Sequence, residues 1–358
     1  MYPKSYKIIG VMSGTSLDGL DLSLCEFKTE NEVTTFEVLN TETISYQPIW
    51  KDNLREIYKD SAENYFKLHG LFGAFIGEQI NSFLHKNNQT TVYIASHGHT
   101  IFHQPASGFT SQIGCGATIA ATTGIATISD FRSLDVALKG QGAPLVPIGD
   151  RDLFRDYESC LNMGGIANIS FHKNHKTEAF DICIANMALN YLSETIDLPF
   201  DKHGKMASTG VVEEQLLKQF LNLHTAHQSI GREWFESHFL PILNNSLIAL
   251  NHKMATCVEY IAIQIADVLL KNQLQSVFIT GGGVYHLHLI ERLKFHYNGK
   301  IHIPSDEIIQ FKEAIIFAYL GYLRIHEHVN TLSSVTKAVK DSVGGCVYLG
   351  NNYKIKNN

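Results

Sequence analysis

The 358-residue sequence lacks the charge balance of a typical nucleic-acid-binding protein. Its 29 lysines and arginines stand against 35 acidic residues, which gives a net charge of −6. Proteins that hold nucleic acid through a general basic field need the opposite excess, whereas a small anionic ligand needs only a few local donors. We therefore expect a small-molecule partner and no nucleic acid.

Long apolar runs and paired cysteines are absent as well. No uncharged apolar stretch approaches the roughly 20 residues of a membrane-spanning helix, and the N-terminus carries no signal-like apolar region. The 6 cysteines are scattered and form no Cys-x-x-Cys pair, a pattern typical of reduced thiols. These absences predict a cytoplasmic protein with no membrane partner.

The composition is that of a globular chain with a sizeable core. Hydrophobic residues make up 44% and charged residues 18%, while 8 prolines and 27 glycines exclude proline-rich and collagen-like classes. At roughly 150 residues per domain, the length predicts about two domains.

The order of predicted strands and turns along the chain supports two domains. Residues 7–27 and 160–171 each read as a strand, a glycine turn and a second strand. No short-period repeat accompanies them, so solenoids and propellers are excluded. The simplest account is two α/β domains of like topology.

Three glycine turns follow predicted strands, at Gly14, at Gly164 with Gly165, and at residues 281–283. Glycine lets the backbone aim its N–H groups at an anion. The third turn also precedes a predicted helix, whose N-terminus would add positive potential. None of the three matches a Walker or dinucleotide-binding pattern.

The first turn is rich in oxygen-bearing side chains. Ser13, Thr15 and Ser16 offer hydroxyl donors, and Asp18 and Asp21 offer carboxylates that could hold Mg²⁺ through water. An Asp-Gly pair is also a common turn, so this chemistry is not unique to a phosphate site.

Histidine is unusually frequent, with 18 residues. His97, His99 and His103 cluster just after a strand predicted at residues 91–95, in a loop predicted at 96–100. Three histidines can ligate zinc, but this spacing is not a recognised zinc motif.

Six blocks of sequence, in order over nearly the whole chain, resemble the anhydro-N-acetylmuramic acid kinases. The blocks cover residues 9–21, 130–132 with 140–147, 161–168, 201–205, 281–283 and 312–320. The resemblance implies two ribonuclease-H-like (actin-like ATPase) α/β domains, with a nucleotide cleft between them. It assigns residues 1–133 and about 340–358 to the first domain, and residues 134–339 to the second.

The resemblance also implies a reaction. Such a kinase uses ATP, with Mg²⁺, to open the 1,6-anhydro ring of anhydro-N-acetylmuramic acid with water and to phosphorylate O6. The products are N-acetylmuramic acid 6-phosphate and ADP, in the recycling of peptidoglycan sugars. A homodimer is compatible with this reading.

By the same resemblance, Asp181 is the catalytic base and Asp18 is a candidate for the Mg²⁺ that accompanies ATP. The residues that correspond to ATP and phosphate contacts are Gly14, Thr15, Ser16, Leu17, Asp18, Gly19, Leu20, Asp21, Asn162, Gly164, Gly165, Gly281, Gly282 and Gly283. Those that correspond to the sugar site are His97, Arg132, Asn186 and Glu313. On pattern alone, Asp181 would be a turn residue, Arg132 a solvated loop residue and Glu313 the first-turn residue of a helix predicted at 312–325.

Three positions depart from the family pattern. The family's Asp-Thr-Gly-Pro-Gly-Asn loop is replaced by residues 181–186, Asp-Ile-Cys-Ile-Ala-Asn. Lys139 stands where the family commonly has glycine, and His99 replaces the usual glutamine. The first departure bears on the backbone around the proposed base.

Two other classes remain open at this point. One is a kinase of the same superfamily that acts on a different sugar or acid. The other is a nucleotide-driven binding module in which ATP changes the shape of the protein, as in Hsp70 or actin. A base at Asp181 and an acid-recognising arginine at Arg132 favour an enzyme, because a binding module needs neither.

Overall fold

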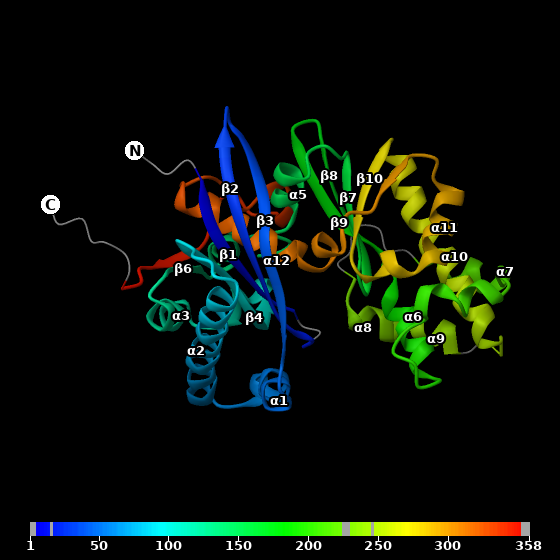
Figure 1. Ribbon diagram of the computed structural model, residues 1–358. Helices are drawn as coiled ribbons and strands as arrows, with labels where there is room; N and C mark the ends of the chain where they lie inside the picture. Colours follow the sequence, from blue (N-terminus) through cyan, green and yellow to red (C-terminus); the bar gives the residue numbers. More distant parts are fainter. Residues whose placement is uncertain (1–4, 15–16, 224–229, 245–246, 352–358) are drawn as a thin grey trace. The chain divides into compact units, whose positions relative to one another are not determined.

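The computed structural model describes residues 5–14, 17–223, 230–244 and 247–351 (Figure 1). Contacts divide the chain into two compact units, Met1–Leu153 with Phe311–Asn358, and Phe154–Gln310. The sequence prediction differs from this division, because it placed residues 134–153 and 311–339 in the second domain. Here both segments belong to the first unit.

The first unit is built on a seven-stranded sheet with the order β12-β6-β4-β1-β2-β3, and β5 pairs with β4. Strands β1 to β3 form an antiparallel meander, whereas β1, β4 and β6 run parallel. The short last strand, red in Figure 1, joins the edge beside β6. The strands are β1 (Tyr6–Ser13), β2 (Gly19–Glu30), β3 (Val33–Ser45), β4 (Tyr93–Gln104), β5 (Phe109–Ile113), β6 (Ala126–Ser129) and β12 (Cys346–Tyr348).

The second unit repeats this plan in a five-stranded sheet with the order β11-β10-β7-β8-β9. Strands β7 to β9 again form an antiparallel meander, and β7, β10 and β11 run parallel. The strands are β7 (Ser159–Met163), β8 (Ile166–Lys173), β9 (Lys176–Ile184), β10 (Ser276–Thr280) and β11 (Lys300–His302). The predicted fold class, an α/β protein of two like-built halves, is confirmed.

Helices cover both sheets. The first unit contains α1 (Pro48–Glu56), α2 (Ala62–Lys86), α3 (Gly116–Thr123), α4 (Ser133–Ala137), α5 (Pro147–Leu153) and α13 (Ser333–Thr336). The second unit contains α6 (Asn186–Glu194), α7 (Glu214–Leu221), α8 (Arg232–Trp234), α9 (Leu240–Asn244), α10 (Leu250–Lys271) and α11 (Leu287–His296). Helix α12 (Asp306–Ile325) runs across the boundary at residue 311.

Close packing explains why most of α12 belongs to the first unit. A Cβ atom added to Gly10 of β1 would lie 1.8 Å from the Ala314 carbonyl oxygen, so only glycine admits the helix here. Lys312 forms a buried ion pair with Asp150 of α5, with an Nζ–Oδ1 distance of 2.7 Å. These contacts fasten both the helix and residues 134–153 to the first sheet.

Hydrophobic alternation in β2 is confirmed. Leu20, Leu22 and Leu24 are all 0% exposed and belong to the core of the first unit. In the second unit, α10 and β9 contribute to a separate core. Each unit therefore has an apolar interior of its own, as expected for two domains.

Two predicted elements have different bounds in the structure. The strand predicted at 91–95 continues as β4 to Gln104, because β5 pairs with its second half. Helix α12 begins at Asp306, so Glu313 lies about two turns into the helix and does not open it. The dipole interpretation of Glu313 is therefore wrong.

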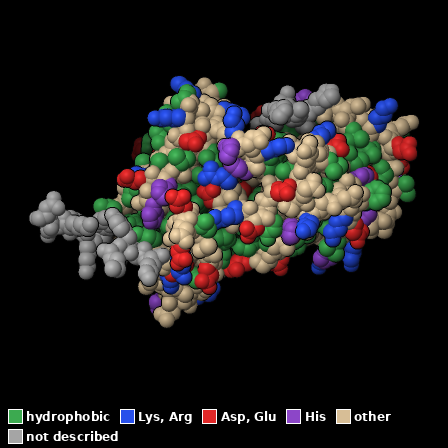
Figure 2. Space-filling view, turned by 90° about the horizontal axis from the view of Figure 1, so that it is seen from above, with side chains coloured by type: hydrophobic (Ala, Val, Ile, Leu, Met, Phe, Trp, Pro, Cys, Tyr) green, Lys and Arg blue, Asp and Glu red, His purple; other side chains and the backbone are tan. Residues whose placement is uncertain are grey.

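The surface offers no single-sign field in the view drawn. Basic, acidic and histidine side chains are interspersed on the face in Figure 2. Over the described part of the chain, no helix combines the length and the apolar character needed to cross a membrane.

Candidate functional site

The first glycine turn lies between β1 and β2. The N–H of Leu17 donates to the Gly14 carbonyl at 3.2 Å, and Leu17 has a left-handed φ of 60°. Leu17 and Leu20 are 9% and 0% exposed, so Leu20, a predicted phosphate contact, has no surface left for a ligand. Thr15 and Ser16, both predicted phosphate contacts, lie outside the described residues.

Two carboxylates stand at the exit of this turn. Asp18 is exposed, whereas Asp21 is partly buried and accepts a hydrogen bond from Thr43 Oγ1 at 2.6 Å. Burial raises the pKa of Asp21, and the neighbouring charge of Asp18 raises it further. Carboxylate oxygens are hard donors of the kind that Mg²⁺ prefers. Gly19 begins β2 next to them, where an added Cβ would lie 2.7 Å from the Ile44 carbonyl oxygen.

Arg132 is held by two hydrogen bonds within the first unit. Its Nε donates to His97 Nε2 at 3.0 Å, and its Nη1 donates to the Gly142 carbonyl at 2.6 Å. Burial lowers the pKa of Arg132 to about 10, and the negative charge of Glu313 opposes that change. A guanidinium carries five N–H groups, so the remaining ones are available to a carboxylate.

Both ring nitrogens of His97 are occupied. Nδ1 lies 2.9 Å from the Gly98 carbonyl oxygen, which only accepts, so Nδ1 carries the proton and Nε2 accepts from Arg132. Burial holds the pKa of His97 well below its usual value, and the Arg132 charge acts in the same direction. His97 was predicted to line the sugar site, and its geometry suits orienting Arg132 instead.

Glu313 lies among the other charges of the first unit. Burial raises its pKa, while the charges of Arg132 and Lys312 lower it. The residue keeps an exposed surface, so solvent screens part of these interactions. Glu313 and Arg132 are thus electrostatic neighbours, as the sequence prediction requires for two groups that serve one ligand.

The zinc hypothesis gains no support from the histidine cluster. His97 contacts Arg132, His99 Nδ1 lies 2.9 Å from Ser13 Oγ, and His103 Nδ1 lies 3.1 Å from Thr110 Oγ1. Each ring therefore has a separate neighbour. Within the described ranges, no three His, Cys, Asp or Glu side chains are grouped to hold a metal ion.

In the second unit, the predicted nucleotide residues come together around Gly281–Gly283. Gly281 has a left-handed φ of 86°, and a Cβ there would lie 2.5 Å from Asn162 Oδ1. A Cβ at Gly283 would lie 2.7 Å from that of Met163 and 3.4 Å from Asn186 Oδ1. Two asparagine amides thus flank a turn that leaves no room for a side chain at its first and third positions.

Asn186 also ties this turn to the one at Gly164 and Gly165. Its Nδ2 donates to the Met163 carbonyl at 3.0 Å, and its backbone N–H donates to the Gly164 carbonyl at 3.1 Å. The N–H groups of Ala185 and Met187 both donate to the Gly165 carbonyl. Asn186 therefore builds the nucleotide-side turns, and only part of its amide is left for a sugar.

The helix that the sequence predicted from residue 286 is α11, and it does not adjoin the third turn. A 3-10 turn, η6 (Gly282–Tyr285), separates it from α11. The start of α11 is capped by His286, whose Nδ1 accepts from the Leu289 N–H at 3.1 Å. The helix N-terminus is thus occupied by a side chain of its own.

Asp181 lies inside β9 and not after a strand. Pairing with β8 shifts register here, since Ala167 faces Cys183 while Asn168 faces Asp181. This bulge leaves Ile182 as the extra residue, and bulges turn neighbouring side chains in a new direction. The residues that replace the family's glycine-proline-glycine segment, Cys183, Ile184 and Ala185, are buried in the core at 0% exposure.

The Asp181 carboxylate is partly buried. Its Oδ2 accepts a hydrogen bond from the Ile230 N–H at 3.0 Å. Burial raises its pKa, and the hydrogen bond partly opposes this rise. A carboxylate with a raised pKa accepts protons more readily near neutral pH, which suits a general base.

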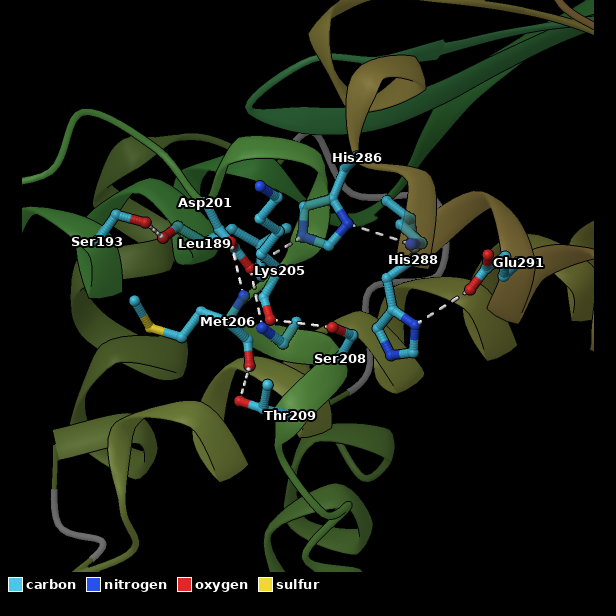
Figure 3. Close-up of polar contacts among 12 residues, drawn as sticks. Leu189, Ser193, Asp201, Lys205, Met206, Ser208, Thr209, His286, His288 and Glu291 are labelled. Atoms are coloured by element: carbon cyan, nitrogen blue, oxygen red, sulfur yellow. Dashed lines mark hydrogen bonds and ion pairs between the residues drawn. The ribbon is translucent and has the colours of Figure 1, made fainter.

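Figure 3 shows the contacts that hold the block at residues 201–205, one of those that resemble the family. The Asp201 carboxylate accepts from the N–H groups of Met206 and Ala207, each at 2.9 Å. Its Oδ2 also lies 3.7 Å from His286 Nε2, and an added Cβ on Gly204 would lie 2.5 Å from His286 Cε1. His286 thereby packs this loop against the residues that follow Gly281–Gly283.

Comparison with known proteins decides the family. Residues 6–350 match the model of the family described as "Anhydro-N-acetylmuramic acid kinase". The chain belongs to this family. A curated relative of that name from Sulfurimonas denitrificans is 32% identical over 95% of this chain and 98% of its own length. Another from Aliivibrio fischeri is 33% identical over 96% of this chain and 100% of its own.

The kinase family assignment confirms the resemblance seen in the sequence. Solved structures show only distant similarity: an activator of 2-hydroxyisocaproyl-CoA dehydratase from Clostridium difficile is 13% identical, with a TM-score of 0.43 over 90% of this chain and 96% of that one.

The sequence does not reveal the residues that hold the predicted site residues in place. Gly142 fixes Arg132 and Ile230 fixes Asp181, both through backbone atoms, and backbone contacts leave no residue-type signal. Tyr46, which donates to Ser13, is equally silent in the sequence. For Asp201 and His286 a signal existed, because block 201–205 and turn 281–283 were both recognised, but nothing in the sequence joined them.

Proposed function

We propose that the protein converts 1,6-anhydro-N-acetylmuramic acid, ATP and water into N-acetylmuramic acid 6-phosphate and ADP. The setting is the recycling of peptidoglycan sugars in the cytoplasm. The observation that carries the choice of substrate is Arg132, because a guanidinium held by two hydrogen bonds keeps three further N–H groups that suit the carboxylate of a sugar acid. A neutral sugar would offer that guanidinium no carboxylate.

Asp181 is the proposed base. It takes a proton from water as the water oxygen bonds to the anomeric carbon, and the bond from that carbon to O6 breaks. The freed O6 then bonds to the γ-phosphorus of ATP, and the bond to the ADP oxygen breaks. The raised pKa of Asp181 supports this role, since it makes proton transfer from water less unfavourable.

The nucleotide is assigned to backbone groups. Gly14, Gly164 with Gly165, and Gly281–Gly283 offer backbone N–H groups, and Asn162 adds an amide beside the third turn, where Gly281 has no room for a Cβ. Such groups position phosphates without charge of their own. When bound, Mg²⁺ would neutralise phosphate charge, and Asp18 and Asp21 are the residues that would hold it.

The sugar is assigned to charged side chains of the first unit. Arg132 binds the lactyl carboxylate, His97 keeps the guanidinium in place, and Glu313 offers a carboxylate to hydroxyl groups. Asn186 adds the unused part of its amide. A homodimer stays a prediction.

The test is the identity of the product. The protein is incubated with ATP, Mg²⁺ and the anhydro sugar, and the sugar is examined by mass spectrometry. We expect a product that has gained the elements of water and one phosphoryl group. A folded protein that forms no such product would refute the proposal, and ATP consumption without sugar conversion would favour a nucleotide-driven binding module.

A further inference from the structure

Three buried polar side chains form a chain at the base of the first glycine turn, and the proposed reaction gives them no role. Tyr46 donates its hydroxyl hydrogen to Ser13 Oγ at 2.6 Å, and Ser13 Oγ lies 2.9 Å from His99 Nδ1. Tyr46, Ser13 and His99 are 4%, 1% and 4% exposed. The Ser13 hydroxyl is therefore committed to protein partners and is not the free phosphate donor that the sequence suggested.

The chain joins the two ends of the turn. Ser13 is the last residue of β1, immediately before Gly14. Tyr46 follows β3, whose last residue, Ser45, pairs with Gly19 at the start of β2. The bond from Tyr46 to Ser13 thus spans the point where the backbone enters the turn and the point where it leaves.

His99 adds a third strand to this brace. Ser13 of β1 pairs with His99 of β4 just after a register shift between the two strands. A shifted register leaves the strand end less well defined by the ladder alone. The contact between Ser13 Oγ and His99 Nδ1 fixes it through side chains.

The protonation states of Tyr46 and His99 preserve this chain of hydrogen bonds around neutral pH. Burial raises the pKa of Tyr46, and the charge of Asp21 raises it further, so its hydroxyl stays protonated and donates. Burial lowers the pKa of His99 to about 4, so its ring is neutral. A neutral imidazole nitrogen either accepts from Ser13 or donates to it, and both arrangements keep the link.

We propose that Tyr46, Ser13 and His99 are positioning residues for the phosphate-binding turn at Gly14. The inference rests on the proposed function in one respect, namely that this turn binds the nucleotide phosphates. Backbone N–H groups stabilise a phosphate only while they are aimed at it, so a brace across the base of the turn sets nucleotide affinity. His99 therefore contributes to nucleotide binding, although His97, two residues earlier on β4, was predicted to line the sugar site.

The test is Tyr46→Phe, which removes the hydroxyl and keeps the ring against Phe72 and Phe75. Affinity for a non-hydrolysable ATP analogue with Mg²⁺ is measured by calorimetry, together with KM for each substrate. We expect nucleotide binding to weaken by about fivefold to tenfold, the size of one hydrogen bond, with KM for the sugar unchanged. Tyr65→Phe is the matched control, because Tyr65 pairs with Ser111 in the same unit, away from the turn.

His99 variants distinguish a contribution of β4 to nucleotide binding from a contribution to sugar binding. His99→Ala should weaken nucleotide binding as Tyr46→Phe does, and His99→Gln should restore most of the loss because an amide can also pair with Ser13. Adding Tyr46→Phe to Ser13→Ala should cause little further loss. Should Tyr46→Phe not fold, Ser13→Ala alone decides.

Unchanged nucleotide affinity in folded Tyr46→Phe, or a His99→Ala effect confined to KM for the sugar, would overturn the inference. These outcomes differ from a failure of the proposed function. In that case the wild-type protein binds the nucleotide analogue but forms no phosphorylated sugar.

Discussion

The two units place different chemistry on the same strand order. In the first, the candidates include a glycine turn and four charged side chains, Asp18, Asp21, Arg132 and Glu313. Burial shifts the pKa of the last three, and the charges of Arg132 and Glu313 also act on each other. In the second, glycine turns and asparagine amides dominate, and Asp181 is the one charged candidate. The duplicated topology therefore supplies two frames that both carry glycine turns, and the charged candidates other than Asp181 all lie in the first.

The difference teaches where substitutions should act. Side-chain chemistry is lost when one side chain is truncated, so the first unit should respond to conservative changes of charge. A backbone cradle has no side chain to remove, so it should respond to added atoms instead. Four predictions follow this contrast from the largest effect to the smallest.

Asp181→Asn should have the largest effect, because it removes the one charged candidate from the second unit while keeping its size. General-base catalysis contributes about 10²- to 10⁴-fold, so kcat should fall by that range. Affinity for ATP, measured by calorimetry, should not change. Asp197→Asn, at an exposed position of the same unit, is the control. Full activity in Asp181→Asn would remove this residue as the base.

Arg132→Met tests the charged cluster of the first unit. Loss of a charge-assisted pair costs about 1.5–3 kcal/mol, so KM for the sugar should rise by about 10- to 100-fold. KM for ATP should stay within about twofold, because the nucleotide is assigned to backbone groups. Arg55→Met, on the exposed face of α1, should be silent. A selective rise in KM for ATP would contradict the assignment.

Gly281→Ala tests the backbone cradle. The new Cβ would lie 2.5 Å from Asn162 Oδ1, and alanine is strained at a φ of 86°. We expect about tenfold weaker nucleotide binding by calorimetry and little change in KM for the sugar. Gly108→Ala is a close control, since it has a φ of 81° with no atom within 4 Å of its added Cβ. Equal losses in both variants would attribute the effect to strain in the fold.

Of the four predictions, the dependence of activity on pH should show the smallest effect near neutral pH. Asp181 accepts a proton only when it is ionised, and its pKa lies above the ordinary value of 3.8. Activity should therefore be present above the raised pKa and be lost as the pH falls through it, about tenfold per unit below. A plot of kcat/KM against pH should show this acid limb. A limb at or below the ordinary aspartate range would contradict the burial argument.

The sequence predicted what depends on residue type and order. Three glycine turns, the duplicated strands and the alternation of Leu20, Leu22 and Leu24 all follow from local pattern. The contacts that orient the site depend on tertiary structure: His97 was assigned to the sugar, yet both of its nitrogens are occupied. Helix α12 starts earlier than expected because Asp306 and Glu307 supply acidic first-turn residues ahead of the apolar run.

The position of Asp181 shows the same limit. Its residue type and sequence block marked it as a candidate, but the bulge at Ile182 that sets its direction arises only from pairing with β8. The loss of the family's glycine-proline-glycine segment looked like a loop change. It is a change of packing, because Cys183, Ile184 and Ala185 enter the core instead.

The central claim is that water, activated by Asp181, attacks the sugar and that O6 receives the phosphoryl group. The reaction run briefly in oxygen-18 water tests this most directly, with mass spectrometry of both products and with unlabelled product as the control for spontaneous exchange. We predict one labelled oxygen, in the hydroxyl group on the anomeric carbon of the sugar, and none in the phosphoryl group. Label in phosphate, or a phosphorylated sugar that carries no label, would contradict the account.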